Sequence, residues 1–194
     1  MNLTSIFDNI YLKKIWLNKD GGTESGPGSC IKYSRKYIDY LMTYIREFEI
    51  KSILDVGCGD LNLMRHVLQD VNINEYLGID ISKVVTDTNI KNYPNYNFKN
   101  ISLSDSDIID GEYELCLIKD VLQHMTNDNI VEILSHIYKF KHTIIVNDYK
   151  KGNEDCVNGG YRGLDLTSDP FNLNPKYTFL YKSHNHNKEV IVIR

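Results

Sequence analysis

The sequence predicts an α/β fold: a doubly wound open sheet of seven strands, five of them parallel and the last two forming an antiparallel hairpin. Within residues 51–148, short apolar segments alternate with segments whose apolar residues recur at helical spacing. This alternation is typical of β-α units in a parallel sheet. Several of the apolar segments, such as LCLI and TIIV, contain almost no polar residue, as expected for strands that helices cover on both faces.

Each element follows from a local pattern. Ser29, Ser82 and either Thr126 or Asn127 precede segments of helical periodicity and can cap helices with their side chains. Glycines end the first strand, and the sequence NHN offers a turn between two apolar segments near the C-terminus. The elements form one Rossmann-like domain over residues 1–194. In chain order, we predict a helix at 30–48, a strand at 51–60 with its turn, a helix at 61–70, a strand at 75–81, a helix at 82–91, strands at 96–103 and 113–121, a helix to about residue 140, a strand at 141–148, and a hairpin of 177–184 and 188–194.

Composition narrows the class of protein. The chain has 194 residues, of which 42% are hydrophobic and 25% charged, which suits one globular domain rather than a disordered regulator. A net charge of −4 and a pI of about 5.8 provide no broad attraction for nucleic acid or anionic lipid. The four cysteines are far apart and form no C-x-x-C pair, so we expect neither a disulfide framework nor a metal site.

The sequence shows no pattern typical of a membrane span or of an export signal. No window approaches the ~18 consecutive apolar residues of a membrane span. The N-terminal residues lack the basic-then-apolar order of a signal peptide. We therefore expect a cytoplasmic protein without a membrane partner.

The turn after the first strand predicts a nucleotide-like ligand. Gly57 and Gly59 allow a ligand to approach backbone N–H groups closely. Asp80 ends the second strand about 20 residues further on, where an acid commonly binds both hydroxyls of a ribose. A dinucleotide site requires a third glycine, and Asn62 stands in its place. Asp55 and Asp60 flank the turn, and two carboxylates favour a cationic ligand without phosphate. The sequence therefore favours S-adenosylmethionine (SAM) over NAD.

The same segments resemble a known family. DVGCGD (55–60), GIDIS (78–82) and LCLIKDVLQHM (115–125) are similar to motifs I, II and IV of the class I SAM-dependent methyltransferases. WLNKDGGTESGPGS (16–29) and NEDCVNGGYRGLDLTSDPFNL (153–173) resemble the ends of a small group of microbial and large-DNA-virus methyltransferases, some of which are associated with glycan synthesis. A viral member would act in the host cytoplasm. The chain departs from that group's pattern at Gly57 (proline), Lys119 (arginine), Tyr161 (tryptophan) and Ser102 (an acid).

The resemblance implies a SAM site covered by an N-terminal lid, residues 1–29, that excludes water from the sulfonium. Trp16 either contacts SAM or anchors the lid. Asp60 either contacts SAM or caps the following helix together with Asn62, and Cys58 also suits a simple packing role. The expected cofactor-binding residues are Trp16, Ser25, Gly26, Ser29, Asp55, Gly57, Cys58, Gly59, Asp60, Asp80, Ile81, Ser102, Leu103, Asp120 and Val121.

Four residues after the later strands are candidates for chemistry. His124 follows the fourth strand closely and can take a proton from an acceptor hydroxyl, or brace the strand end. Asp120 and Asp148 end strands beside it and shape the same pocket. Residues 149–176 form a long acceptor loop, in which Arg162 holds the acceptor or ties the loop to a carboxylate.

These observations predict a SAM-dependent O-methyltransferase that produces S-adenosylhomocysteine and methylates a small polar acceptor, such as a sugar of a glycan or a nucleotide sugar. The alternatives are an RNA- or protein-directed methyltransferase and a non-catalytic SAM-binding scaffold. The missing basic clusters argue against a nucleic-acid partner. Intact Gly57, Gly59 and Asp80 argue against an inert scaffold.

Overall fold

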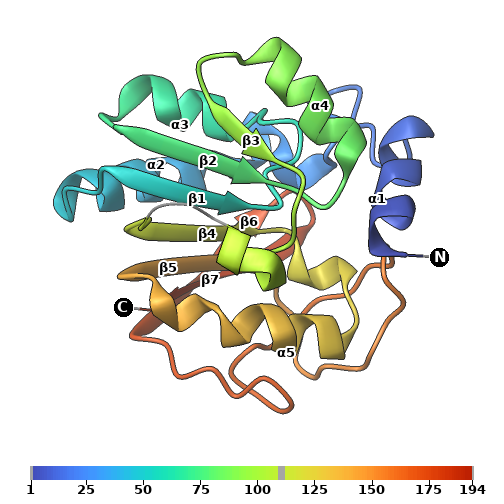
Figure 1. Ribbon diagram of the computed structural model, residues 1–194. Coiled ribbons are helices and arrows are strands. Elements are labelled where there is room, and N and C mark those ends of the chain that lie inside the picture. The colour runs from blue at the N-terminus through green and yellow to red at the C-terminus, as the bar shows by residue number, and fades with distance from the viewer. Residues whose placement is uncertain (1, 109–111, 194) are drawn as a thin grey trace.

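The computed structural model describes residues 2–108 and 112–193. Its sheet has seven strands in the order β3-β2-β1-β4-β5-β7-β6, and helices cover both faces (Figure 1). Neighbouring strands from β3 to β5 run parallel, whereas β7 pairs antiparallel with both β5 and β6. The predicted seven-stranded α/β fold with a C-terminal hairpin is therefore confirmed. The strands are β1 (Ser52–Val56), β2 (Glu75–Ile79), β3 (Asn97–Lys99), β4 (Leu115–Lys119), β5 (His142–Asp148), β6 (Tyr177–Ser183) and β7 (His186–Ile193).

The helices bury their apolar sides in two core clusters, one on each face of the sheet. Leu41 of α2 and Val67 of α3 belong to one cluster, and Ile130 of α5 belongs to the other. The side chains of Ser82 and Thr126 accept hydrogen bonds from the first turns of α4 and α5, so these two predicted caps are confirmed. The helices are α1 (Leu3–Leu12), α2 (Ile31–Glu47), α3 (Met64–Asp70), α4 (Lys83–Asn92) and α5 (Asn127–Ser135).

Several predicted boundaries were wrong for local reasons. Ser29 belongs to a short 3₁₀ turn, Pro27–Ser29, and Cys30 is the N-cap of α2 without a side-chain bond. The helix expected at 61–70 begins at Met64, because Leu61 adopts a left-handed φ of 59°. The helix expected to reach residue 140 ends at Ser135, and a separate 3₁₀ turn follows. The third strand has three residues rather than eight, and the hairpin turn lies before His186.

Helix α1 was not predicted, although its pattern is readable. The side chain of Asn2 accepts the N–H of Ser5 and caps the helix, while Phe7, Ile10 and Tyr11 form the buried side. Figure 1 shows α1 beyond the carboxyl ends of β1 and β2, beside α4. The leading segment thus lies over the edge of the sheet where the strand order reverses between β1 and β4, the usual place for a ligand in such sheets. No helix among the described residues is long and apolar enough to cross a membrane.

Candidate active site

The turn after β1 brings the backbone close to two other segments. Gly57 and Gly59 have φ values of 67° and 55°, which glycine adopts without strain. A Cβ at Gly57 would overlap Val121, and one at Gly59 would lie 2.5 Å from the Ser25 hydroxyl. Both glycines therefore permit close packing as well as the turn itself.

Asp80 lies beside this turn and is buried. One carboxylate oxygen accepts the N–H of Gly59 at 3.1 Å, and the other accepts the N–H of Ser82 at 2.9 Å. Burial raises the pKa of Asp80 to about 6, although the backbone N–H groups act in the opposite direction. The carboxylate is thus fixed in position at the carboxyl end of β2.

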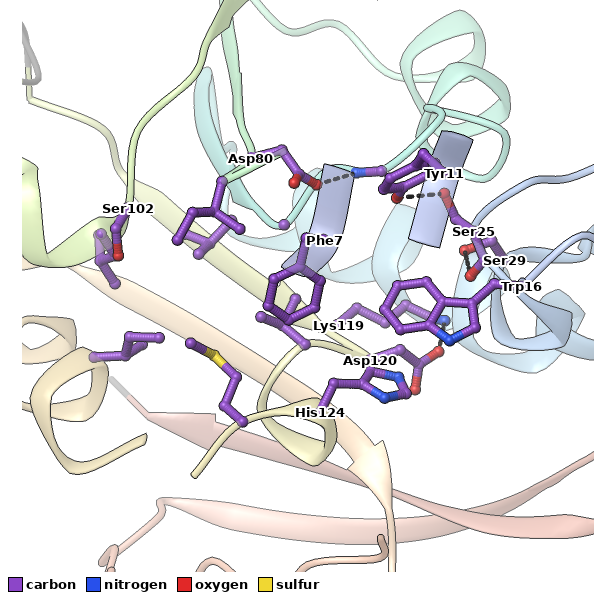
Figure 2. A pocket seen from close by; sticks show the side chains of 18 of the residues that line it. Phe7, Tyr11, Trp16, Ser25, Ser29, Asp80, Ser102, Lys119, Asp120 and His124 are labelled. Atoms are coloured by element: carbon purple, nitrogen blue, oxygen red, sulfur yellow. Dashed lines mark hydrogen bonds and ion pairs between the residues drawn. The ribbon is translucent and has the colours of Figure 1, made fainter. Parts of the chain in front are cut away.

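These groups face a pocket that we name the strand-end cavity (Figure 2). Most of the residues expected to bind a cofactor line it. Aromatic rings of α1 and Trp16 close one side, and Ser102 and Ile81 lie at another. The expected residues in its wall are Trp16, Ser25, Ser29, Gly57, Gly59, Asp80, Ile81, Ser102, Leu103, Asp120 and Val121, and the further residues include Phe7, Tyr11, Val56, Lys119 and Met125.

Three expected cofactor residues, Asp55, Cys58 and Asp60, line a small neighbouring cavity behind the turn. Asp55 is buried and accepts a hydrogen bond from the Tyr76 hydroxyl at 2.7 Å. Burial raises the pKa of Asp55 to about 6 and raises that of the Cys58 thiol well above its usual range. Cys58 is therefore a poor nucleophile at neutral pH.

Asp60 fastens the leading segment to the sheet. Its Oδ2 accepts the Thr23 hydroxyl and the N–H of Glu24, both at 2.7 Å. At the other end of the segment, Asp8 accepts the Ser82 hydroxyl at 2.7 Å. The two carboxylates hold residues 3–24 over the strand-end cavity, so Asp60 holds the lid in place rather than lining the larger pocket.

A second pocket, which we name the hairpin cavity, lies between the lid, β4, β5 and the β6–β7 hairpin. Gly26 lines this cavity and not the strand-end cavity, contrary to its expected cofactor role. Four residues, Trp16, Ser25, Asp120 and His124, line both cavities and mark their common wall. The other residues of the hairpin cavity are Gly26, Pro27, Gly28, Gln123, Asp148, Tyr161, Ser183, His184, His186 and Lys188.

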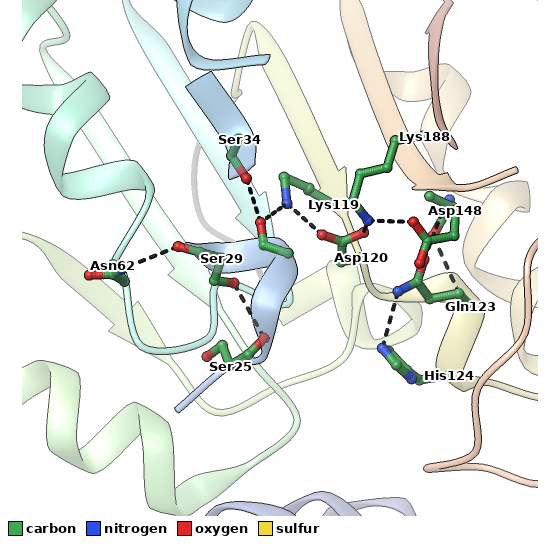
Figure 3. A network of polar contacts seen from close by, with 12 residues as sticks. Ser25, Ser29, Ser34, Asn62, Lys119, Asp120, Gln123, His124, Asp148 and Lys188 are labelled. Atoms are coloured by element: carbon green, nitrogen blue, oxygen red, sulfur yellow. Dashed lines mark hydrogen bonds and ion pairs between the residues drawn. The ribbon is translucent and has the colours of Figure 1, made fainter. Parts of the chain in front are cut away.

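A chain of ion pairs crosses the floor of the hairpin cavity (Figure 3). Asp120 forms direct ion pairs with Lys119 and Lys188, and Lys188 also contacts Asp148 at 2.8 Å. Burial alone would raise the pKa of Asp120, but the two ammonium groups hold it well below its usual range. The Lys188 ammonium occupies the place between the two carboxylates that a metal ion would require. Among the described residues, no group of three metal-ligating side chains is found.

The lid touches this chain directly. Lys119 donates a hydrogen bond to the carbonyl oxygen of Gly28 at 2.7 Å, and the Ser34 hydroxyl donates to the same oxygen at 2.6 Å. Asp120 has a left-handed φ of 58°, an uncommon conformation for a residue with a side chain. The strained turn places its carboxylate directly beneath the lid.

The common wall contains two titratable side chains, Asp120 and His124. Asp120 forms ion pairs with lysines, whereas His124 forms none with the described residues. Its Nδ1 lies 2.7 Å from the carbonyl oxygen of Gly160, so Nδ1 carries the proton and donates it. The side-chain Oε1 of Gln123 accepts the N–H of Asp148, which fixes the orientation of the amide. The amide nitrogen of Gln123 therefore faces Nε2 of His124, at 3.4 Å. Burial lowers the pKa of His124, and the ring lies against Trp16 with centroids 4.6 Å apart. The imidazole is therefore neutral at pH 7, and its Nε2 accepts the hydrogen bond from the Gln123 amide.

The contacts of Arg162 favour the second of its two expected roles, a tie within the loop. Its guanidinium donates to the carbonyl oxygens of Met125 and Glu154 and to the side chains of Asn127 and Asp155. It lines neither of the two cavities. These partners lie in the loop and at residues 125–127, so Arg162 ties the loop to the segment that leads into α5.

Sequence reasoning missed three contributors to the site. Phe7 and Tyr11 were missed because α1 was not predicted, and Lys188 because no local pattern marks a buried ion pair. The alternation of His184, His186 and Lys188 along the hairpin was visible, and one side of a strand repeats every two residues. Within β7, that spacing could have placed His186 and Lys188 on the same face.

Comparisons with known proteins agree with this geometry. Residues 54–141, from β1 to the start of β5, match the family model of a methyltransferase domain. The matched segment includes the glycine turn, Asp80, Asp120 and His124. The match and the shared fold support a SAM-dependent methyltransferase, with SAM as the methyl donor. No match was found among curated protein sequences.

Solved structures share the fold at low sequence identity. Magnesium protoporphyrin IX methyltransferase from Synechocystis PCC 6803 with bound SAM is 12% identical, over 99% of this chain and 96% of that one, with a TM-score of 0.68. A 1,6-didemethyltoxoflavin-N1-methyltransferase from Burkholderia thailandensis is 14% identical, over 98% and 85%, with a TM-score of 0.64. The N-methyltransferase NodS from Bradyrhizobium japonicum is 9% identical, over 84% and 96%, with a TM-score of 0.62.

Proposed function

We propose that the protein transfers the methyl group of SAM to a hydroxyl of a small polar acceptor, such as a sugar of a glycan or a nucleotide sugar. The observation that carries this proposal is the position of His124. A neutral imidazole stands in the wall between two cavities, where a donor on one side and an acceptor on the other would meet. Such an arrangement suits removal of a proton from a hydroxyl during methyl transfer.

The lining of the strand-end cavity offers polar and apolar groups that suit SAM. Asp80 is placed to accept hydrogen bonds from the ribose hydroxyls, and Ser102 and Leu103 lie where an adenine would end. Asp55, in the small cavity behind Gly57, offers a carboxylate for the ammonium of the methionine portion. When bound, SAM supplies a methyl group already activated by its sulfonium. The chain therefore contributes mainly alignment, which can lower such a barrier by ~7–11 kcal/mol.

In the hairpin cavity, the acceptor hydroxyl would give its proton to Nε2 of His124. Asp120 is a poor base, because Lys119 and Lys188 keep its pKa well below the usual range. The hydrogen bond from Nδ1 to Gly160 fixes the ring and stabilises the charge that the imidazole gains. Trp16 covers the ring and, together with the lid, keeps water away from the point of transfer.

Two measurements test the proposal. Calorimetry with SAM, S-adenosylhomocysteine and NAD should show binding of the first two and negligible binding of NAD, since Asn62 replaces the third glycine of a dinucleotide site. Incubation with labelled SAM and a panel of free sugars, sugar phosphates, nucleotide sugars, RNA and protein should transfer label to a sugar. Transfer to RNA or protein would replace the proposed acceptor, and SAM binding without transfer to any class would favour a scaffold.

A further inference from the structure

The tip of the β6–β7 hairpin contributes two exposed imidazoles to the hairpin cavity, and neither belongs to the proton transfer described above. Both line the cavity: His184 lies in the hairpin turn, and His186 is the first residue of β7. The His186 Nδ1 lies 3.2 Å from the Tyr161 hydroxyl, and the His184 ring packs edge-to-face on Tyr33 at 4.5 Å. Both rings are thus oriented by aromatic neighbours while remaining open to solvent.

The conformation of His184 favours a role in binding. Its φ is 50°, a left-handed value that glycine or asparagine adopts more readily in a hairpin turn. Histidine adopts left-handed φ values more often than most residues with a side chain, and here the ring lies against Tyr33 at the wall of the hairpin cavity. Turn formation alone would favour a smaller residue.

The carboxylates of the cavity wall already pair with lysines and form no ion pair with these imidazoles. Asp120 and Asp148 are the carboxylates of the cavity wall, and the ammonium groups of Lys119 and Lys188 neutralise both. The imidazoles at the rim therefore add hydrogen-bond donors to a floor whose charges balance one another. A group with negative charge is the partner that such imidazoles bind best.

The distance from the proposed base is also suitable. The Tyr161 ring centroid lies 5.9 Å from that of His124 and 5.9 Å from that of His186. One aromatic ring thus separates the two imidazoles. A single small molecule can place a hydroxyl at His124 and a charged group at the hairpin tip.

From these observations, we infer that His184 and His186 form an anion subsite, and that the acceptor carries a phosphate or carboxylate close to the hydroxyl that is methylated. This inference rests on the proposed function, because it specifies which class of acceptor the same site binds. It distinguishes acidic acceptors, such as sugar phosphates and uronic acids, from neutral sugars.

The test uses the full chain labelled with ¹³C and ¹⁵N in histidine, saturated with S-adenosylhomocysteine, at pH 6. Methyl phosphate, acetate and the neutral methyl glucoside are titrated in separate experiments. We expect saturable shifts of the His184 and His186 imidazole signals with an anion and none with the glucoside, while His66 of α3 stays unchanged. A response to methyl phosphate alone indicates a phosphate acceptor, and a response to acetate alone indicates a carboxylate.

His184→Gly separates binding from turn stability. Because glycine suits the left-handed φ, the unfolding temperature should stay equal or rise, whereas anion affinity should fall about tenfold or more with the loss of a charge-assisted hydrogen bond. His186→Asn should weaken anion binding similarly, and His66→Ala serves as the matched control. If neither imidazole responds to either anion while S-adenosylhomocysteine binds, the subsite is wrong and the proposed function stands. If S-adenosylhomocysteine itself fails to bind, the proposed function falls, and the acceptor assignment falls with it.

Discussion

The strand-end cavity and the hairpin cavity are built in different ways. The sheet side of the first is made from consecutive strand–turn–helix units, in which Asp80 binds the N–H of Ser82 in its own turn and that of Gly59, 21 residues away in the preceding unit. The second depends on ion pairs between distant segments, such as Lys188 with Asp120, 68 residues apart in the chain. The comparison teaches that the sheet side of the strand-end cavity comes from short motifs, whereas the hairpin cavity depends on tertiary packing.

The largest expected effect lies at the wall common to both cavities. Replacing His124 by alanine should reduce kcat by ~10²–10⁴, the usual contribution of a positioned base, because Asp120 cannot take over the proton. Affinity for S-adenosylhomocysteine, measured by calorimetry, should change little. His66→Ala on α3 is the control. Full turnover of His124→Ala across pH 6–9 on the true acceptor would assign the residue a bracing role instead.

Lys188 tests how far the hairpin cavity depends on its ion pairs. Lys188→Met keeps the length of the side chain but leaves Asp120 and Asp148 without their shared cation. Breaking a buried pair in this way should destabilise the fold by ~3–5 kcal/mol, measured as the free energy of unfolding in urea. Lys83→Met is the control, because the Lys83–Asp87 pair is exposed and should cost less than ~1 kcal/mol. Equal losses in both variants would contradict the buried network.

Arg162 distinguishes a loop tie from an acceptor contact. Arg162→Ala removes hydrogen bonds to Met125, Asn127 and Glu154 and should destabilise the protein by ~1–3 kcal/mol. Hydrogen exchange should increase in residues 153–163 and at the start of α5. Donor affinity should be unchanged. Unaltered exchange in the loop together with a raised acceptor KM would return Arg162 to the acceptor site.

Gly28 tests whether the lid must close against the ion pairs. A Cβ at Gly28 would overlap the Asp120 carboxylate, so Gly28→Ala should displace the lid and weaken donor binding about tenfold, as expected for ~1–3 kcal/mol of overpacking. Gly22→Ala is a control in the same segment for backbone strain alone, because its φ is 61° and nothing lies within 4 Å of its added Cβ. Calorimetry with S-adenosylhomocysteine gives both values. Equal affinity in the two variants would show that the contact is dispensable.

The contrast between the cavities also explains what the sequence could predict. The sheet, the glycine turn and Asp80 follow from local periodicity and from motif spacing, and the structure places the turn and Asp80 at one cavity. The sequence left two roles open for Arg162, because a cation in a glycine-rich loop looks the same whether it faces a ligand or its own loop. Lys188 was invisible because its partners, Asp120 and Asp148, lie 68 and 40 residues away. Predicting the role of either residue requires knowledge of which distant segments lie in contact.

The smallest expected effect is a pH dependence of donor binding that arises in the strand-end cavity. Burial raises the pKa of Asp80 to about 6 from an ordinary value of 3.8, and the pKa of Asp55 rises similarly. Ionised carboxylates are required to accept hydrogen bonds from a ribose or to pair with an ammonium. Affinity for S-adenosylhomocysteine should therefore be constant above pH 7 and should fall several-fold between pH 7 and pH 5.

Stability of the free protein should change in the opposite direction. A carboxyl whose pKa is raised in the folded state binds its proton more tightly there than in the unfolded chain. The stabilising contribution of Asp80 and Asp55 is therefore complete below pH 3.8 and is lost as the pH rises through about 6. Asp80→Asn, which cannot ionise, should bind the donor weakly and with a flatter pH profile. Wild-type affinity that stays constant from pH 5 to pH 8 would contradict the role of these carboxylates, since a donor held by Asp80 cannot be indifferent to the protonation of that group.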